Sequence, residues 1–276
     1  MSRSRLLGTE DYNQLAAAKD GYFLYNRNDQ YVGRAIEMYG EFSGLEMELL
    51  RQLCVPGNVV IEVGANIGAH TVGLARQVGS QGRVLAFEPQ RLVFQTLCAN
   101  VALNSLENVD CFWAAVGSKD GVAIVPELSP RQEVNFGGVT LLGVQAGLNV
   151  RCLTLDRFIA LHHLNLIKID VEGMEADVLR GGEQLLKKFK PILYVENDRI
   201  DKSEELIRLI AGFGYRMFWH EPPMFNPNNF FSNSENIYPE IVSVNMLCHH
   251  RDSEMSLTGF KEVDDFSFHP CLEPVK

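Results

Sequence analysis

Three acidic residues stand at the ends of strand-like segments and are this sequence's clearest candidates for chemistry. Asp170 ends the segment 164–170, Glu172 follows it, and Glu196 lies at the end of the segment 191–197. Clustered carboxylates could orient a hydroxyl group, take up its proton or hold a divalent cation. Because ligands bind at the carboxyl ends of the strands in an open α/β sheet, we expect these acids to face one crevice.

Other polar residues near these acids have simpler interpretations. Glu175 lies at the start of a predicted helix, where an acid favours the helix dipole. Lys168 is two residues before the first acid and is predicted to be its ion-pair partner, and His220 is a weaker candidate base. Neighbouring histidines at 162–163 and 249–250 point apart on a helix or strand, so no metal ligand is assigned.

A second group of residues has the layout of a cofactor site. Residues 59–63 form an apolar strand that carries Glu62, and a turn with Gly64, Asn66 and Gly68 follows it. The next strand ends in Glu88, twenty positions after Gly68. A turn that lets the backbone approach a ligand, followed by a distant acid for ribose hydroxyls, is typical of adenosine-cofactor sites. A glycine turn that merely packs a helix on a strand would lack this paired acid.

The positions of the glycines separate the possible cofactors. A dinucleotide-binding turn needs a glycine at its third position to admit a pyrophosphate, and that position holds Asn66. No Gly-Lys-Ser/Thr follows the turn, which excludes a P-loop. The spacing instead resembles the first motif of S-adenosylmethionine-dependent methyltransferases. Glu62 and the backbone of residues 64–68 would then face the amino and carboxylate groups of the cofactor, and Glu88 its ribose.

The elements that position these residues alternate along the middle of the chain. Strands are predicted at 59–64, 83–88, 109–116, 164–170, 191–197 and 215–219, and helices at 68–79, 91–104, 175–188 and 202–212. Apolar strands separated by helices indicate a parallel sheet covered on both faces. A further strand at 241–248 is expected to complete a doubly wound, mostly parallel, seven-stranded α/β sheet of the Rossmann-like methyltransferase type.

The outer segments divide the chain into an extension at 1–58, a methyltransferase-like domain at 59–250 and a tail at 251–276. In the extension, strands at 21–25 and 31–36 are predicted to form a hairpin around the turn 26–30. A helix follows, with Ser43 and Glu46 as a capping box, and Pro56-Gly57 ends it. Residues 117–154 are predicted to be a β-rich insertion with strands at 122–125, 139–142 and 150–153.

Composition limits the protein's partners and its location. The 276-residue chain has a net charge of −10, which argues against a large nucleic-acid footprint. Its six cysteines are scattered and without metal-ligand spacing, as in reduced cytosolic proteins. No signal region or run of transmembrane length is visible. We therefore predict a cytoplasmic protein without a membrane span that binds a small molecule or glycan.

The motifs taken together resemble the FkbM-family methyltransferases, a branch of the class I S-adenosylmethionine-dependent enzymes. The resemblance covers roughly residues 40–200. It rests on Pro56-Gly57, on residues 62–68 and 86–89, on Ala115-Val116-Gly117 with Asp120-Gly121, on residues 168–175, on Gly181-Gly182, and on Pro191 to Glu196. Glu62 stands where many members have Asp, which lengthens the side chain and keeps its charge.

The resemblance implies S-adenosylmethionine as cofactor and a role for each matching residue. It implies cofactor contacts for Glu62, Gly64, Asn66, Gly68 and Glu88, a place near the adenine for Ala115, and a place near the transferred methyl group for Asp170. Such enzymes commonly methylate hydroxyl groups of sugars, polyketides or related natural products. Asp170 is then the predicted acceptor-orienting group or base, with Glu172 and Glu196 assisting. Residues 1–58 and 117–154 are expected to determine the acceptor.

Two other functions stay open from the sequence. One is a nucleotide- or cofactor-binding module without catalysis, although the mutual repulsion of the clustered acids disfavours a purely structural site. A NAD-dependent oxidoreductase is less favoured because of Asn66. The acceptor, any need for a divalent metal and the oligomeric state are not specified by these residues.

Overall fold

An eight-stranded mixed sheet forms the centre of the molecule in the computed structural model, which describes residues 11–272. In sheet order the strands are β13 (Lys261–Glu262), β11 (Tyr215–His220), β12 (Asn245–His250), β10 (Ile192–Glu196), β9 (Leu166–Ile169), β3 (Val59–Val63), β4 (Arg83–Phe87) and β5 (Val109–Phe112). β12 is antiparallel to both of its neighbours, and β3, β4, β5, β9 and β10 are parallel to one another. The doubly wound, mostly parallel sheet of the prediction is confirmed, and β13 adds a short antiparallel edge to it.

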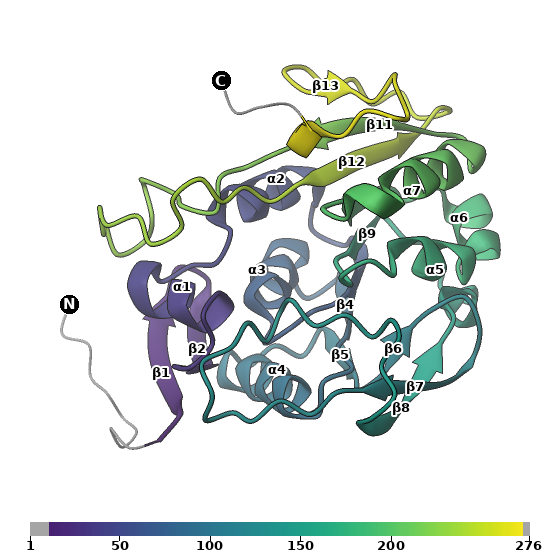
Figure 1. Cartoon of the computed structure of the whole chain (residues 1–276). Coiled ribbons are helices and arrows are strands. Elements are labelled where there is room, and N and C mark those ends of the chain that lie inside the picture. The colour runs from purple at the N-terminus through teal and green to yellow at the C-terminus, as the bar shows by residue number, and fades with distance from the viewer. Residues whose placement is uncertain (1–10, 273–276) are drawn as a thin grey trace.

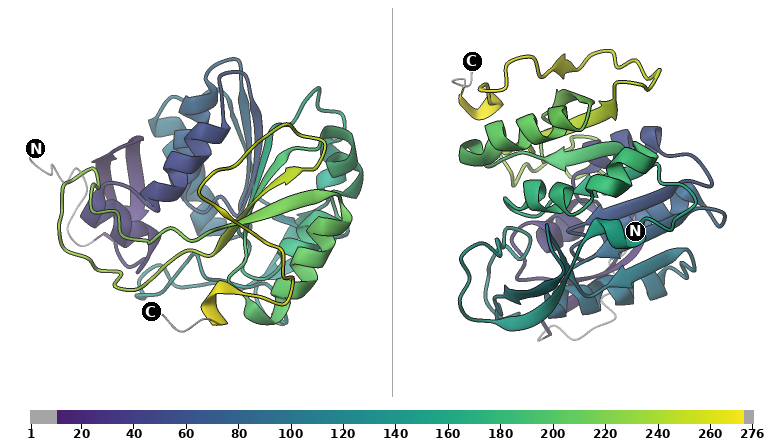
Figure 2. Two further views of the ribbon diagram at one scale, coloured as in Figure 1. Left: turned by 90° about the horizontal axis from the view of Figure 1, so that it is seen from above. Right: turned by 90° about the vertical axis from the view of Figure 1, so that its right-hand side faces the viewer.

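Helices cover both faces of this sheet (Figures 1 and 2). One layer contains α2 (Gly44–Leu53), α3 (Ala69–Val78) and α4 (Arg91–Leu103), and the other contains α5 (Glu175–Arg180), α6 (Glu183–Phe189) and α7 (Ile200–Gly212). Every residue of β3 and β9 is buried because these strands lie between both layers. Of these two central strands, only the carboxyl ends can contribute to a binding site, and helices and loops surround them.

The predicted helix at 175–188 is interrupted, and the single-helix expectation is wrong. α5 ends before Gly181, and α6 begins after Gly182. A Cβ atom on Gly181 would lie 2.1 Å from the carbonyl oxygen of Gly117. The break therefore brings this backbone against the start of the 117–154 segment, which an unbroken helix with side chains would prevent.

The N-terminal hairpin has different strands from those predicted. β1 (Asn13–Ala18) pairs with β2 (Gly21–Asn26), whereas the expected second strand at 31–36 belongs to helix α1 (Val32–Tyr39). Asp29 explains the difference, because its carboxylate accepts hydrogen bonds from the backbone N–H groups of Tyr31 at 3.1 Å and Gly33 at 2.9 Å. The polar residues read as a hairpin turn therefore start a helix.

Helix α2 occupies its predicted place, but its capping box is absent. Ser43 has a φ of +44° and makes no side-chain cap hydrogen bond. The carboxylate of Glu46 instead accepts a hydrogen bond from Nδ2 of Asn245, at 3.2 Å. Glu46 thus connects the N-terminal extension to β12 across 199 residues of sequence.

Two strands of the 117–154 segment join the preceding β6 in a separate three-stranded sheet, in the order β6 (Ala115–Val116), β8 (Leu148–Leu153) and β7 (Gly121–Val125). The predicted strands at 122–125 and 150–153 are confirmed, and a short 3-10 helix (Leu155–Phe158) follows β8. The predicted strand at 139–142 is wrong, because those residues lie in a loop between β7 and β8. The predicted strand at 109–116 is divided between β5 and β6, which belong to different sheets.

Helix α4 fixes the N-terminal hairpin to the central domain. Asn100 is fully buried; its Oδ1 atom accepts from the Leu24 backbone at 2.6 Å, and Nδ2 donates to the carbonyl oxygens of Leu24 and Ile67 at 3.0 and 2.8 Å. Asn104 makes an equivalent pair of hydrogen bonds with Tyr22. These amides supply the edge of β2 with the partners that a neighbouring strand would otherwise provide.

The described residues include the greater part of the predicted extension and tail. Residues 1–10 of the extension and 273–276 of the tail lie outside them. A final 3-10 helix spans Pro270–Leu272. Between residues 11 and 272, none of the helices combines the length and apolar composition that crossing a membrane requires.

Candidate functional site

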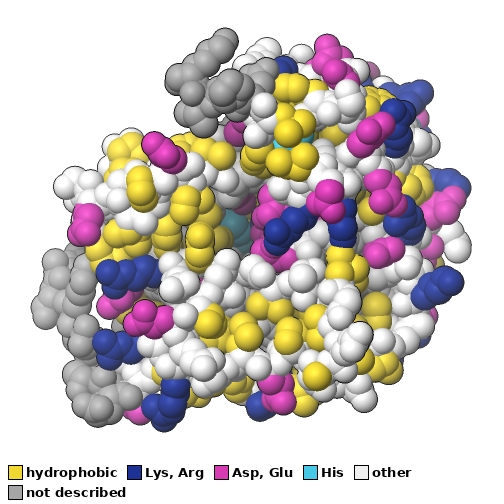
Figure 3. Space-filling model, viewed as in Figure 1, with side chains coloured by type: hydrophobic (Ala, Val, Ile, Leu, Met, Phe, Trp, Pro, Cys, Tyr) yellow, Lys and Arg dark blue, Asp and Glu magenta, His cyan; other side chains and the backbone are white. Residues whose placement is uncertain are grey.

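A cavity of about 360 Å³ opens at the carboxyl ends of β3, β4, β9 and β10. Figure 3 shows this hollow near the centre of the view, with charged side chains on one side and hydrophobic side chains on the other. Nearly all of the predicted site residues line it: Glu62, Gly64, Asn66, Glu88, Ala115, Asp170, Glu172 and Glu196. Gly68 is the exception among the predicted residues.

The turn after β3 needs its glycines for two different reasons. Gly64 has a φ of +85°, and a Cβ atom there would lie 1.8 Å from the carbonyl oxygen of Asp170. Gly68 has a φ of +84° and precedes α3, where a Cβ atom would lie 2.7 Å from Leu97. Gly64 therefore brings the turn against the end of β9 at the cavity, whereas Gly68 permits the packing of α3 on α4.

Glu88 is joined to the turn by a hydrogen bond. Oε2 of Glu88 accepts a hydrogen bond from the backbone N–H of Asn66 at 3.0 Å, and Oε1 accepts one from the N–H of Gln90 at 2.7 Å. The side chain is buried, and burial raises its pKa to about 7, although these two hydrogen bonds oppose the shift. Each oxygen keeps a further lone pair for a donor in the cavity.

Glu62 faces inward from β3 and is held by the next helix. Its Oε2 atom accepts a hydrogen bond from the hydroxyl of Thr71, at 2.6 Å, in a fully buried environment. Burial raises the pKa of Glu62 to about 7, while the charge of Lys168 acts in the opposite direction. Glu62 therefore belongs to the buried charge network beneath the cavity as well as to its lining.

Lys168 is the predicted ion-pair partner of Asp170, and the structure confirms the pair. Nζ of Lys168 lies 2.9 Å from Oδ2 of Asp170; the lysine side chain is 3% exposed and the aspartate side chain 35%. Burial alone would raise the pKa of Asp170, but the charge and hydrogen bond of Lys168, together with the hydrogen bond from Glu196, lower that pKa below its ordinary value. Asp170 is thus an ionised carboxylate that is open to the cavity.

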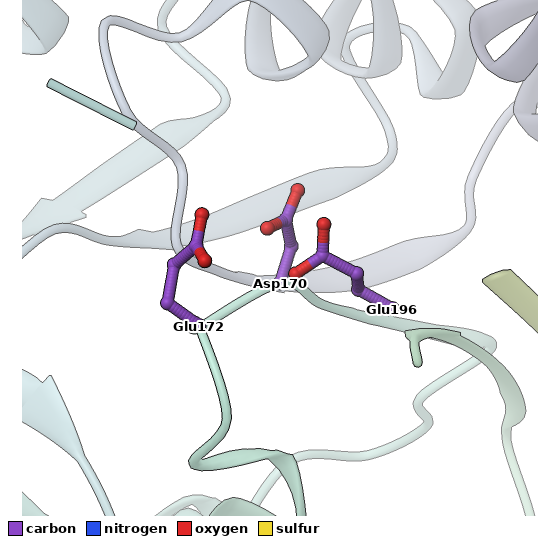
Figure 4. A group of neighbouring side chains, drawn as sticks. All are labelled: Asp170, Glu172 and Glu196. Carbon is purple, nitrogen blue, oxygen red and sulfur yellow. The ribbon is translucent and has the colours of Figure 1, made fainter. Parts of the chain in front are cut away.

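Asp170, Glu172 and Glu196 form the expected cluster, with carboxylate oxygens within 4.8 Å of one another (Figure 4). Burial, and then the charge of Asp170, raises the pKa of Glu196 well above its usual range, and a hydrogen bond joins the two side chains. Glu196 is therefore the protonated member of a carboxylic acid–carboxylate pair.

Glu172 has its own cationic partner in this cluster. It has a φ of +56°, and its carboxylate pairs with the guanidinium of Arg199. The pKa of Glu172 is raised to about 7. Burial is the larger cause, and the negative charge of Asp170 raises it further. Lys168, Arg199 and the shared proton together offset the repulsion between the three acids, and the Asp170 side chain stays partly exposed at the cavity.

The neighbouring polar residues have the simpler roles that were expected. Oε1 of Glu175 accepts hydrogen bonds from the backbone N–H groups of Val171 at 3.2 Å and Gly173 at 2.9 Å, so Glu175 holds the loop before α5. Nδ1 of His220 lies 2.8 Å from the hydroxyl of Tyr194, and His220 is not part of the cavity lining. The geometry thus does not favour His220 as a base.

Part of the cavity wall comes from residues that sequence reasoning missed. Its apolar part is formed by Tyr31, Phe42, Met224, Ile241 and Val242. Glu46, which was interpreted as a capping residue, and His70, noted only as part of a helix start, also line the cavity. The apolar residues of this wall are half-buried or exposed, so apolar periodicity does not mark them as core residues or show which surface they face.

The sheet order and the acid-bearing turn define a Rossmann-like methyltransferase fold. The chain belongs to the methyltransferase FkbM family, whose model matches residues 62–217. This match begins within β3, includes the cofactor turn and the acid cluster, and ends within β11. The apolar wall lies outside it, in the N-terminal extension and after β11.

Curated relatives agree with this assignment. Methyltransferase 1 of Beauveria bassiana (strain ARSEF 2860) is 27% identical over 143 residues, which cover 44% of this chain and 57% of the relative. Methyltransferase sdnD of Sordaria araneosa is 26% identical over 165 residues, covering 47% and 62% of the two chains. The chain thus spans about three fifths of the length of these relatives.

A solved structure of an FkbM methyltransferase from Methylobacillus flagellatus KT is also similar to this chain. The two are 16% identical, with a TM-score of 0.46, and the match covers 74% of this chain and 51% of the other.

Proposed function

We propose that this protein transfers a methyl group from S-adenosylmethionine to a hydroxyl group of a small acceptor. The observation that carries the proposal is the placement of Glu88 and Asp170 at one cavity, the first bound to the turn after β3 and the second ionised at the end of β9. Family membership supports methyl transfer as the reaction. The acceptor and the role of each residue are our proposals.

The residues around the turn fit this cofactor. Glu88 has lone pairs available for the two ribose hydroxyls, and Ala115 offers a small apolar surface where the adenine would lie. Gly64 and Asn66 line the cavity, and the missing side chain at Gly64 lets the aminocarboxypropyl group approach the turn. Bound there, the cofactor supplies an electrophilic methyl group on a sulfonium.

The chain's own contribution to the reaction is to orient the acceptor and to receive its proton. In the transfer an oxygen–carbon bond forms on the acceptor as the sulfur–carbon bond breaks, so the acceptor oxygen must lie in line behind the methyl group. Asp170 accepts a hydrogen bond from the acceptor hydroxyl and takes its proton as the new bond forms. Lys168 keeps Asp170 ionised beforehand, and the proton on Glu196 limits the repulsion in the cluster.

The charges of the cavity favour an acceptor without a negative charge. Seven acidic side chains, of which that of Glu196 is protonated, line it: Glu46, Glu62, Glu88, Asp170, Glu172, Glu196 and Asp198. The lysine and the arginine in the described lining, Lys168 and Arg199, both pair with these acids. A phosphate or carboxylate on the acceptor would therefore meet repulsion without a free cation.

The apolar wall further supports an acceptor with an apolar face, such as a deoxygenated sugar or a polyketide-like natural product. Phe42, Met224 and Val242 form part of this wall, and the Val242 side chain is 45% exposed. Sugars and natural products with a free hydroxyl both satisfy these conditions.

The six cysteines, all free in the structure, support a cytoplasmic location.

Titration calorimetry and product analysis test the proposal. We expect S-adenosylmethionine to bind and NAD to show no binding; the reverse result would favour an oxidoreductase. Release of S-adenosylhomocysteine is then measured with paired compounds, such as tyrosol and its phosphate ester or a methyl glycoside and its 6-phosphate. Tight cofactor binding without release from any neutral hydroxyl compound would favour a non-catalytic cofactor-binding module.

A further inference from the structure

His70 is a buried polar residue of the cavity that the proposed reaction does not yet use. It is the second residue of α3, it lines the cavity, and it is 4% exposed. Its electrostatic neighbours include Lys168 and Asp170, the ion pair at the centre of the site. His70 therefore lies where the methyl donor and the acceptor would meet.

The N-terminal extension holds the ring of His70 from one side. The ring packs against Phe42 with centroids 5.8 Å apart, and it forms a hydrogen bond with the backbone of Ser43. Ser43 has a φ of +44°, a conformation that a non-glycine residue adopts at a cost. The strained backbone at Ser43 thus contributes to the orientation of a side chain in the cavity.

The other side of the ring has no partner. Among the described residues, none forms a hydrogen bond with Nε2 of His70, although the atom is shielded from solvent. Burial, and then the nearby charge of Lys168, lowers the pKa of His70 to about 3, so the ring is neutral. The hydrogen bond to Ser43 raises this pKa, as expected when a ring N–H donates to a carbonyl oxygen. Nε2 is then the unprotonated nitrogen, with a free lone pair.

We propose that Nε2 of His70 accepts a hydrogen bond from the bound reactants, making His70 a positioning residue for methyl transfer. Its partner is an N–H or O–H donor, supplied either by the ammonium group of the cofactor or by the hydroxyl of the acceptor. A buried nitrogen without a hydrogen-bond partner is costly, and such a ligand would satisfy it. This inference rests on the proposed function, since it assumes that both reactants share the cavity.

Two substitutions separate the nitrogen from the ring that carries it. In His70→Asn the side-chain amide can replace Nδ1 at Ser43, but nothing replaces Nε2. In His70→Gln the amide reaches the place of Nε2 instead. His220→Asn is the matched control, because His220 is a half-buried histidine outside the cavity lining. Thermal unfolding of all three variants reports any purely structural cost.

Calorimetry with S-adenosylhomocysteine and 5′-methylthioadenosine tests the cofactor as the source of the donor. If the ammonium is the partner, His70→Asn weakens the binding of S-adenosylhomocysteine by about tenfold or more and leaves the binding of 5′-methylthioadenosine unchanged. His70→Gln then restores part of the lost affinity. The nitrogen-15 resonance of Nε2, assigned by its absence in His70→Asn, is expected to shift when S-adenosylhomocysteine binds.

The acceptor is tested as the source with the same resonance. Tyrosol and methyl α-D-glucopyranoside are added to the S-adenosylhomocysteine complex. If the Nε2 resonance shifts at this step and did not shift with S-adenosylhomocysteine alone, the donor is the hydroxyl compound. The inference is overturned if Nε2 is protonated in the free protein. It is also overturned if Nε2 shifts with none of these ligands while His70→Asn binds them as the wild type does. Failure of the wild-type protein to bind S-adenosylmethionine would instead reject the proposed function.

Discussion

The backbone N–H of Asn66 donates a hydrogen bond to Oε2 of Glu88 at 3.0 Å, which joins the turn after β3 to the end of β4. Asn66 has a φ of +50°, and its own Oδ1 atom accepts from the N–H of Ile67 at 2.7 Å. The turn is therefore set in a strained but well-bonded conformation before a cofactor binds. Such preorganisation lowers the ordering cost of binding.

Glu88 is expected to make cofactor binding depend on pH. Burial raises its pKa to about 7, so the carboxyl group is protonated below that pH and becomes a better acceptor for ribose hydroxyls above it. The Kd for S-adenosylhomocysteine should fall between pH 6 and pH 8. Glu88→Gln should weaken binding about tenfold at pH 8 and flatten this dependence.

Isothermal titration across this pH range provides the measurement. Glu127→Gln is the control, since that side chain is 56% exposed. Glu62 and Glu172 also titrate near pH 7, so the assignment depends on the difference between wild type and Glu88→Gln. An equal pH dependence in both proteins would contradict it.

Gly64→Ala should damage both the fold and cofactor binding. The new methyl group would lie 1.8 Å from the carbonyl oxygen of Asp170 at a φ of +85°. We expect a loss of more than about 4 kcal/mol in the free energy of unfolding, because a backbone atom cannot move aside easily. Urea denaturation followed by circular dichroism measures it.

Gly57→Ala is the matched control for this substitution. Gly57 has a φ of +90°, but a Cβ atom there would have nothing within 4 Å. Its cost should be the conformational strain alone, about 1–3 kcal/mol. Equal losses in the two variants would mean that contact with Asp170 does not determine the glycine at position 64.

Asp170→Asn should lower turnover by about 10²- to 10⁴-fold while the protein still binds S-adenosylmethionine. The amide can accept a hydrogen bond from the acceptor, but it cannot take up the proton. Formation of S-adenosylhomocysteine at saturating cofactor is the measurement. Asp120→Asn, in a side chain that is 44% exposed, serves as the control, and wild-type turnover in Asp170→Asn would reject the role as base.

Asn100→Ala should separate the N-terminal hairpin from α4. It removes three hydrogen bonds to Leu24 and Ile67 from a fully buried position, and we expect a loss of about 2–4 kcal/mol in the free energy of unfolding. Asn104→Ala removes similar bonds nearer the solvent and should cost under about 1 kcal/mol. Hydrogen exchange of residues 21–26 locates the effect, and protection equal to wild type in Asn100→Ala would contradict this account.

The sequence predicts the central sheet and the cofactor side of the cavity because both depend on local patterns. Val59–Val63 and the run ending at Ile169 are continuous apolar segments, which indicate buried parallel strands. Glu62, Glu88 and Asp170 follow from their places at the ends of such strands. Once the strands are parallel, their carboxyl ends must meet, and the relative positions of these acids follow without any knowledge of side-chain contacts.

The errors arise where a residue has a distant partner. Asp29 looks like a turn residue until its hydrogen bonds to Tyr31 and Gly33 are seen. Glu46 fits a capping box locally, but Asn245 draws its carboxylate away from the helix end. Local propensity cannot include a hydrogen bond across 199 residues.

The predicted strand at 139–142 fails for a related reason. Its apolar residues have a β pattern, yet Val139 and Leu141 lie against the cavity instead of in a sheet. Both side chains are only half-buried, and the apolar pattern cannot distinguish the wall of a ligand cavity from a neighbouring strand. The same limitation hides Met224 and Val242, whose apolar side chains face the cavity from a segment far along the chain.

The position of β12 between β10 and β11 has a consequence for synthesis of the chain. β10 and β11 are made first, yet they cannot pair with each other, because Leu193 and Met217 both face Cys248 of the later strand. Until the ribosome has released Asn245–His250, both strands carry an unsatisfied edge, and such edges recruit foreign strands. The nascent protein is thus most vulnerable to aggregation in the interval between completing β11 and completing β12.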